Sequence, residues 1–291
     1  MKSKISLGAA QFGMDYGVTN LLGKVGVSEI KKILDFAKKN RIESIDTAAS
    51  YGDSEANLGL VNASGFKITS KLPEIDLTNK TQITADINQI INRSLANLKR
   101  DSLDSLLLHR PNQLLHENGQ IVWDFLEEQK NIGVIKKIGF SIYSPAEIDS
   151  LINSFKPDIV QCPYNFFDRR MCETGCFEKL NELEIDIQAR SIFLQGLLLL
   201  NHDNLPENFS RWKKLWVDYD LWLKSNNLDK MELLLNFVLS DNRINSVVIG
   251  VTSFKQLEEI ILKSNNLFEI PENKFSVTDI DLIDPSRWHD S

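Results

Sequence analysis

The sequence predicts an α/β protein whose strands close into a (β/α)8 TIM barrel, and three observations support this. Short apolar runs alternate eight times with longer amphipathic stretches, which is the rhythm of parallel strands joined by helices. The G-x-G-x-x-G fingerprint of an open, doubly wound dinucleotide-binding sheet does not follow the first run. No internal repeat, low-complexity tract or linker divides the 291 residues. We therefore expect residues 1–291 to form one domain.

The eight predicted strands are short and rich in Ile, Val, Leu or Phe, as strands buried on both faces of a parallel sheet are. In chain order they are residues 5–7, 44–46, 67–71, 103–109, 135–141, 159–162, 185–189 and 247–250. The longest connection, residues 190–246, contains helical sequence rich in Leu and Trp. We expect part of this connection to form a loop over the mouth of the barrel.

Helical patterns fill the connections between the strands. Between residues 83 and 98, isoleucines and leucines recur at offsets of three and four, which places them on one face of a helix. Two further helices have the spacing of a capping box at their start, with Ser144 before Glu147 and Ser253 before Gln256. These segments are the helices that we expect to cover the sheet.

Composition excludes some classes of function. Lys and Arg total 33 against 40 for Asp and Glu, a formal charge of -7, and no basic stripe is present to bind nucleic acid. No segment has the apolar length of a membrane span, and the first residues lack the apolar run of a signal peptide. Cys172 and Cys176 lack further ligands for a metal, so with Cys162 they are expected to be reduced thiols. We predict a cytoplasmic protein without a metal site.

Polar residues follow three neighbouring strands. Asp46 ends the second strand and Tyr51 comes shortly after it, Lys71 ends the third, and His109 ends the fourth. Active sites of these barrels lie at the carboxyl ends of the strands, so the four side chains are expected to meet. Each also has a purely structural interpretation: the aspartate as a turn cap, the tyrosine as a packing residue, the lysine at the solvent, the histidine in the core.

Together the four residues are suited to form a site for proton transfer. A lysine ammonium inside a barrel mouth is costly unless a carboxylate pairs with it, and Asp46 lies on the adjacent strand. A cation beside a phenol lowers the phenol's pKa from its usual value of about 10. Tyr51 is then expected to protonate a carbonyl oxygen as a general acid, with His109 orienting that carbonyl.

The segment DTAASYGDSEANLG, residues 46–59, resembles the signature D-T-A-x-x-Y-G-x-S-E-x-x-L-G of the aldo-keto reductase superfamily. The resemblance extends along nearly the whole chain and includes Lys71 and the LLLH run that ends at His109. It implies that Asp46, Tyr51, Lys71 and His109 are the catalytic tetrad. It also implies that hydride comes from a reduced nicotinamide cofactor, because no side chain supplies that chemistry.

The same resemblance implies a cofactor site on the other strands. GFS at residues 139–141 and QCPYN at residues 161–165 resemble the pieces that bind the nicotinamide carboxamide, and residues 249–256 resemble the pyrophosphate and adenosine segment before a helix start. The implied cofactor-binding residues are Gly8, Ala9, Ala10, Ser141, Gln161, Arg190, Ser191, Phe193, Gln195, Gly196, Ile249, Gly250, Val251, Thr252 and Gln256.

The chain departs from the family pattern at three positions. Ile142 replaces an asparagine that often binds the carboxamide, and Arg190 replaces the tyrosine that stacks under the nicotinamide. Thr252, with Lys255 nearby, stands where relatives that prefer the 2′-phosphate carry arginine. The family favours NADPH as the cofactor, and NADH remains an alternative.

The substrate implied by the resemblance is a small carbonyl compound. The segment GAAQFGMDYG, residues 8–17, resembles a branch of bacterial surface-carbohydrate enzymes, which suggests a sugar or nucleotide-sugar carbonyl. Arg169 and Arg170 either bind an anionic group or form a solvated pair. Two other functions stay open: a nicotinamide-binding sensor without useful turnover, and an unrelated barrel enzyme in which Lys71 is a nucleophile. Oligomeric state does not follow from the sequence.

Overall fold

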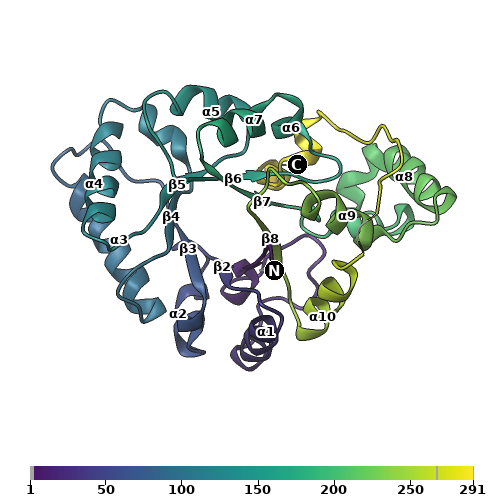
Figure 1. The fold of residues 1–291 in the computed structure, drawn as a ribbon, viewed down its shortest axis with the longest axis horizontal. Coiled ribbons are helices and arrows are strands. Elements are labelled where there is room, and N and C mark those ends of the chain that lie inside the picture. Colours follow the sequence, from purple (N-terminus) through teal and green to yellow (C-terminus); the bar gives the residue numbers. More distant parts are fainter. Residues whose placement is uncertain (1–2, 267, 291) are drawn as a thin grey trace.

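The computed structural model describes residues 3–266 and 268–290, and its eight parallel strands close into a barrel, as predicted (Figure 1). Each strand pairs with the next along the chain, and the last pairs with the first. The strands are β1 (Ile5–Gly8), β2 (Ser44–Asp46), β3 (Lys67–Leu72), β4 (Ser105–Leu108), β5 (Ile138–Ser141), β6 (Ile159–Pro163), β7 (Asp186–Arg190) and β8 (Ser246–Gly250).

Helices surround the barrel, and one follows each strand (Figure 1). In strand order these are α1 (Val27–Lys39), α2 (Ser54–Leu60), α3 (Ile83–Leu98), α4 (Gly119–Asn131), α5 (Pro145–Leu151), α7 (Cys176–Glu182), α9 (Lys230–Leu239) and α10 (Phe254–Lys263). Additional helices are α6 (Arg170–Glu173), α8 (Lys213–Ser225) and α11 (Ile280–Ile283). Short 3-10 turns are η1 (Ala10–Phe12), η2 (Ala63–Gly65), η3 (Pro111–Leu115), η4 (Leu197–Leu199), η5 (His202–Asn204), η6 (Glu207–Trp212) and η7 (Pro285–Asp290).

Two strands are shorter than predicted. The segments expected to start at residues 103 and 135 begin regular pairing only at Ser105 and Ile138, and Leu103 and Ile135 form an isolated bridge. Asp104 explains the interruption, because its carboxylate accepts the Ile68 N–H at 2.9 Å and replaces a backbone partner there. The carboxyl ends of the strands, which position the site, lie within one residue of the predicted ends.

The predicted capping boxes differ in outcome. At α5, the Ser144 side chain and the Glu147 carboxylate cap each other's backbone as expected. At α10, Ser253 Oγ accepts the Gln256 N–H at 3.3 Å, but Gln256 Oε1 accepts from the N–H and hydroxyl of Thr252 instead of from Ser253. The glutamine therefore reaches one residue further back and fixes the loop that leads into the helix.

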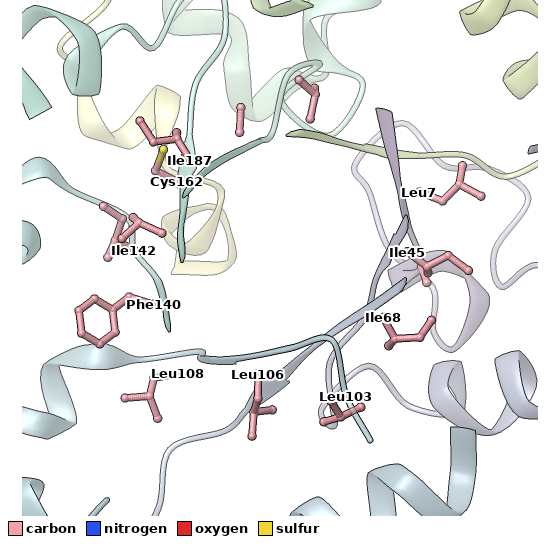
Figure 2. Packing of buried hydrophobic residues seen from close by; sticks show 14 of the residues in the cluster. Leu7, Ile45, Ile68, Leu103, Leu106, Leu108, Phe140, Ile142, Cys162 and Ile187 are labelled. Carbon is pink, nitrogen blue, oxygen red and sulfur yellow. The ribbon is translucent and has the colours of Figure 1, made fainter. Parts of the chain in front are cut away.

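The apolar core lies between the strands and the helices. In Figure 2 the labelled strand side chains, among them Leu7, Ile45 and Ile68, point away from the barrel axis, and each of these three is fully buried. Side chains alternate along a strand, so their neighbours point inward. Many of these inward residues are polar, including the buried Asp46 and Lys71. The barrel interior is therefore the place for chemistry, while the outer layer stabilises the fold.

The long connection between β7 and β8 builds a second apolar cluster. It contributes η4, η5, η6, α8 and α9, and α8 lies at the periphery of the molecule in Figure 1. Trp216 and Tyr219 of α8 are fully buried against Phe166 and Phe167, which follow β6, and against Phe275 near the carboxyl terminus. Most of this connection therefore packs beside the barrel, and only its first residues and a few from η4 and α9 reach the mouth.

Within the described ranges, no helix has both the length and the apolar character needed to cross a bilayer. Cys162, Cys172 and Cys176 are free thiols, as expected. No group of three or more metal-ligating side chains gathers among the residues that the structure describes.

Candidate active site

An ion pair inside the barrel joins two neighbouring strands. Lys71 Nζ lies 2.6 Å from Asp46 Oδ2 and also donates to the Thr47 carbonyl at 2.9 Å. Both side chains are almost completely buried, with exposed fractions of 1% and 6%. The pairing of β2 with β3 and the inward alternation of both residues bring them together. The sequence prediction that Asp46 compensates the lysine charge is thus consistent with the geometry.

Tyr51 and His109 lie above this pair. Lys71 Nζ is 5.0 Å from the centroid of the Tyr51 ring, and the Tyr51 and His109 rings meet edge to face with centroids 5.8 Å apart. His109 Nδ1 is 3.3 Å from Ser50 Oγ, while Nε2 has no hydrogen-bond partner within the described part of the chain. The four predicted catalytic residues therefore gather at one point, as expected.

Burial determines the protonation states of this group. The pKa of His109 is lowered to about 3, first by burial and then by the charges of Lys71, Arg190 and Arg110. His109 is therefore a neutral imidazole at physiological pH. Burial also lowers the pKa of Lys71, and the Asp46 carboxylate opposes this by stabilising the ammonium. We infer that the buried pair remains ionic, because a carboxylate at 2.6 Å compensates the charge.

The pKa of Tyr51 differs from the expectation. A lowered value was expected from the neighbouring lysine, but burial raises it, and the Asp46 charge raises it further, while Arg190 opposes both. The lysine, whose nitrogen lies 5.0 Å from the centroid of the ring, does not overcome the effect of burial. Tyr51 thus holds its proton firmly until a strong base forms beside it, which suits a proton donor to an alkoxide.

A chain of amide side chains crosses the barrel to Asp46. Gln161 Nε2 on β6 donates to Asp46 Oδ1 at 2.6 Å and to Gln188 Oε1 on β7 at 2.7 Å. Gln188 Nε2 in turn donates to Ser246 Oγ at 3.1 Å, and Ser141 Oγ donates to Gln161 Oε1 at 3.3 Å. Both N–H groups of the Gln161 amide therefore already donate hydrogen bonds. Its oxygen can still accept a further hydrogen bond from a ligand.

The strand ends surround a cavity of about 580 Å³, a size typical of small-molecule sites. Of the predicted catalytic residues, Asp46, Tyr51 and His109 line it, and Lys71 lies behind them. Of the predicted cofactor-binding residues, Val251 does not line it, because it alternates outward from the end of β8 into the core. The others do: Gly8, Ala9, Ala10, Ser141, Gln161, Arg190, Ser191, Phe193, Gln195, Gly196, Ile249, Gly250, Thr252 and Gln256.

Glycines form part of the cavity wall where a larger residue would clash. Gly8 and Gly250 pair across β1 and β8, and a Cβ on Gly250 would lie 2.8 Å from Gln11 Oε1. That oxygen is buried and has no partner within the described residues, although Gln11 lines the cavity. An unpartnered buried acceptor beside a glycine cradle fits a ligand with hydrogen-bond donors. A nicotinamide dinucleotide carries such donors on its ribose hydroxyls and its carboxamide.

The loop after β7 closes one side of the cavity in a strained conformation. Ser191, Leu194 and Gln195 have φ between 48° and 60°, and Gly196 has φ 90°. A Cβ on Gly196 would lie 2.0 Å from Thr19 Oγ1, which donates to the Gln195 carbonyl at 3.1 Å. The loops after β1 and β7 are thus tied together across the cavity. Backbone strain of this kind is found mainly where a site requires a fixed shape.

The amino terminus of α10, expected to face a phosphate, already binds a carboxylate. The Phe254 N–H donates to Glu29 Oε1 of α1 at 2.8 Å. This hydrogen bond lowers the pKa of Glu29, so the residue is ionised at neutral pH. Glu259 of the same helix also lines the cavity. One carboxylate therefore occupies an N–H at the start of this helix and a second lines the cavity, and Glu29 is also paired with Lys32 at 3.0 Å.

Three arginines occupy positions that the sequence left open. Arg190 lines the cavity, with its Cζ 4.3 Å from the centroid of the Tyr143 ring. Arg170 pairs with Asp168, and Arg169 donates to Asn273 Oδ1 at 2.6 Å. The last two arginines therefore stabilise the β6 loop, so they neither face an anionic substrate nor form a solvated pair.

The comparisons with known proteins agree with the fold. The sequence pattern of the aldo/keto reductase family matches residues 4–281. The chain belongs to this family. The family assignment confirms the resemblance found in residues 46–59, while the surface-carbohydrate branch stays a prediction.

Three relatives are 26–29% identical to the chain over the aligned residues. The oxidoreductase YqkF of Bacillus subtilis (strain 168) is 26% identical over 256 residues, covering 80% of this chain and 81% of the relative. The aldo-keto reductase YhdN of the same organism is 29% identical over 189 residues, 59% of this chain and 53% of YhdN. The NAD(P)H-dependent 6′-deoxychalcone synthase of Glycine max is 26% identical over 162 residues, 47% and 50% of the two chains.

Solved structures support the same fold. The holo form of an aldo-keto reductase from Bacillus halodurans superposes with a TM-score of 0.70 at 20% identity, covering 91% of this chain and 87% of the other. A thermostable aldo-keto reductase in complex with the inhibitor epalrestat gives a TM-score of 0.69 at 20% identity, covering 92% and 91%. At this identity the superpositions establish the barrel and not the reaction.

The sequence did not predict several residues that support the site. Gln188 connects Gln161 to Ser246 inside the barrel, and its position in the apolar seventh strand was a detectable signal, since a glutamine there needs buried partners. Tyr143 and Glu29 act through contacts between elements that are far apart in sequence. No local pattern could have identified those two.

Proposed function

We propose that this aldo/keto reductase is a working carbonyl reductase that uses NAD(P)H, with Tyr51 as the proton donor. The main support is the buried Lys71–Asp46 pair below Tyr51, at the edge of the large cavity. Family membership supports an oxidoreductase acting on carbonyl groups. The roles of the individual residues are our proposal.

The bound cofactor would supply a hydride to the carbonyl carbon, which no side chain can do. As negative charge develops on the carbonyl oxygen, the Tyr51 hydroxyl donates its proton to that oxygen. The raised pKa of Tyr51 delays this transfer until the oxygen has become strongly basic. Neutral His109 can donate a hydrogen bond to the same oxygen and so orient the carbonyl.

The cavity residues are suited to hold a nicotinamide cofactor. NADPH and NADH differ in a 2′-phosphate, and the residues present bear on both. Gln161 Oε1 and Gln11 Oε1 can accept from amide or hydroxyl groups, and the loop of residues 191–196 can cover them. NADPH is the first expectation from the family. The Glu29 carboxylate at the start of α10 favours NADH, because it would repel a 2′-phosphate placed there.

The two other functions have less support. A nucleophilic Lys71 is disfavoured because its nitrogen is bonded to Asp46 and Thr47 and lies outside the cavity lining. A sensor without turnover is disfavoured because all four predicted catalytic side chains meet. Neither of these functions requires Asp46, Tyr51, Lys71 and His109 to lie together.

The test measures cofactor binding and turnover in the same preparations. Fluorescence titration with NADPH and NADH gives the two dissociation constants, and a panel of aldehydes and ketones gives the rate of cofactor oxidation. We expect tight binding of at least one cofactor and carbonyl-dependent oxidation. In Tyr51→Phe the rate should fall by roughly 100-fold or more, the typical size of a general-acid contribution, with cofactor binding retained.

Three results would contradict the proposal. Full turnover by Tyr51→Phe would show that another group donates the proton. Binding of a cofactor without oxidation by any carbonyl would favour the sensor. Borohydride trapping of a Schiff base on Lys71 would favour the third function.

A further inference from the structure

Two guanidinium groups contact a single tyrosine ring beside the proton donor. Arg190 Cζ lies 4.3 Å and Arg110 Cζ 4.5 Å from the centroid of Tyr143. Arg110 directly follows His109, whereas Arg190 ends β7, so the contact joins opposite parts of the rim. Tyr143 lines both the cavity and a second groove, formed by the loops after β3, β4 and β5. The cluster therefore lies between the groove and the cavity.

Neither cation has an anionic partner within the described residues. Arg190 donates to the Ile142 carbonyl at 2.9 Å and to Ser191 Oγ at 3.1 Å, both of which are uncharged. The contact of the exposed Arg110 side chain is with the Tyr143 ring. By contrast, the partly buried Arg170 pairs with a carboxylate. A partly buried guanidinium without a counter-ion favours an anionic ligand.

The charges around Tyr51 do not cancel. Lys71 and Asp46 balance each other, and His109 is neutral. The charges of Arg190 and Arg110 both depress the pKa of His109, which shows that both lie within electrostatic reach of the reaction centre. A net positive field therefore remains over the place where the carbonyl substrate would lie.

We propose that Arg110 and Arg190 form an anion subsite on Tyr143, and that the substrate is a small aldehyde or ketone bearing a carboxylate. The proposal rests on the carbonyl reductase function argued above. A guanidinium presents paired N–H groups that match a carboxylate in geometry and charge. The subsite would hold the carboxylate while the carbonyl faces Tyr51.

The groove limits the length of the substrate. Glu74, Asp76 and Asp284 line it beyond the arginines, and their charges would repel an extended polyanion. Glu147 also lines the groove, but its carboxylate is bound by the N–H groups of Tyr143 and Ser144. These charges favour a compact oxo acid or sugar acid over a nucleotide sugar.

The test compares substrates with and without an anionic group. Succinic semialdehyde and its methyl ester carry the same aldehyde, and glyceraldehyde 3-phosphate with glyceraldehyde forms a corresponding phosphate pair. We expect wild-type kcat/KM to favour the free acid over the ester by roughly tenfold, the scale of a charge-assisted hydrogen bond. Arg110→Gln and Arg190→Gln should each lower this ratio toward one. Arg93→Gln, an exposed arginine on α3, should keep the ratio.

Each contrary outcome has a defined meaning. Reduction of acid and ester at equal rates by the wild type would overturn the subsite and leave carbonyl reduction standing. A stronger preference for the phosphate than for the carboxylate would overturn the assignment of a carboxylate. If Arg190→Gln weakens cofactor binding in a fluorescence titration without changing the ratio, Arg190 belongs to the cofactor and not to this subsite. If no aldehyde is reduced, the proposed function fails, and this inference fails with it.

Discussion

The strand ends of β2 to β4 and those of β5 to β8 face the same cavity, but different kinds of contact hold them. On the first side, Lys71 and Asp46 pair directly between adjacent strands. On the second, Gln161 reaches across the barrel to Asp46, a residue 115 positions away in sequence. A contact between neighbouring strands holds the first side, whereas a hydrogen-bond network across the barrel holds the second.

This difference separates proton chemistry from ligand positioning. The first side contains the group that would donate a proton and the cation below it. The second side contains amides that fix the Asp46 carboxylate and residues that line the cavity. Changes on the first side should therefore affect the rate of the chemical step most strongly, while changes on the second should alter orientation and cofactor choice.

The largest effect is expected for Lys71→Met. Its loss leaves the buried Asp46 carboxylate without its counter-ion, which costs roughly 3–5 kcal/mol of stability for a buried pair, and turnover should be abolished. Thermal unfolding and cofactor oxidation measure the two effects. Lys67→Met on the same strand, where the side chain is exposed, is the matched control. An active and equally stable Lys71→Met would show that the pair has no role.

A smaller effect is expected for Gln188→Met. The change removes the acceptor of one Gln161 N–H, so the amide that orients Asp46 is less constrained. We expect kcat to fall roughly tenfold and the free energy of unfolding to fall by roughly 1–3 kcal/mol, the cost of an unsatisfied buried donor. Gln120→Met, exposed on α4, should change neither quantity. Wild-type kcat in Gln188→Met would show that the network does not position Asp46.

A shift in cofactor preference is expected for Glu29→Gln. The amide keeps an acceptor for the Phe254 N–H but removes the negative charge at the start of α10. The ratio of the NADPH to the NADH dissociation constant should fall by roughly threefold, since a partly exposed charge contributes less than about 1 kcal/mol. Asp35→Asn, exposed on α1, serves as the control. An unchanged ratio would place any 2′-phosphate away from this helix end.

The smallest effect concerns the pH dependence of stability. The unfolded chain protonates His109 near pH 6.5, whereas the folded state does so only near pH 3. Stability from this residue is therefore lost as pH falls through that window, because protons then favour the unfolded state. His109→Gln should flatten the dependence of the unfolding temperature on pH over the window. An identical slope in both proteins would mean that the pKa of His109 is the same in the folded and unfolded states.

The same comparison explains what the sequence could predict. The sequence could predict that Asp46, Tyr51, Lys71 and His109 meet. They lie at or just after the ends of adjacent strands, and a barrel brings these ends together. The direction of the Tyr51 pKa shift could not be predicted, since it depends on how completely the ring is enclosed and on where the lysine nitrogen lies.

The second side was harder to predict for a related reason. Most expected cofactor residues do line the cavity, because they too lie at strand ends. The contact of Arg190 with Tyr143 and the hydrogen bond from Phe254 to Glu29 join elements whose relative positions follow only from packing. Local patterns contain no signal for such contacts.

The most direct test of the central claim follows the transferred hydrogen. The wild type and Tyr51→Phe are each given a carbonyl substrate and a reduced cofactor that carries deuterium at the hydride position of the nicotinamide. The account predicts that the wild type places deuterium on the former carbonyl carbon, that the new hydroxyl proton comes from solvent by way of Tyr51, and that Tyr51→Phe forms little product while still binding the cofactor. Product without deuterium on that carbon, or equal product from Tyr51→Phe, would contradict it.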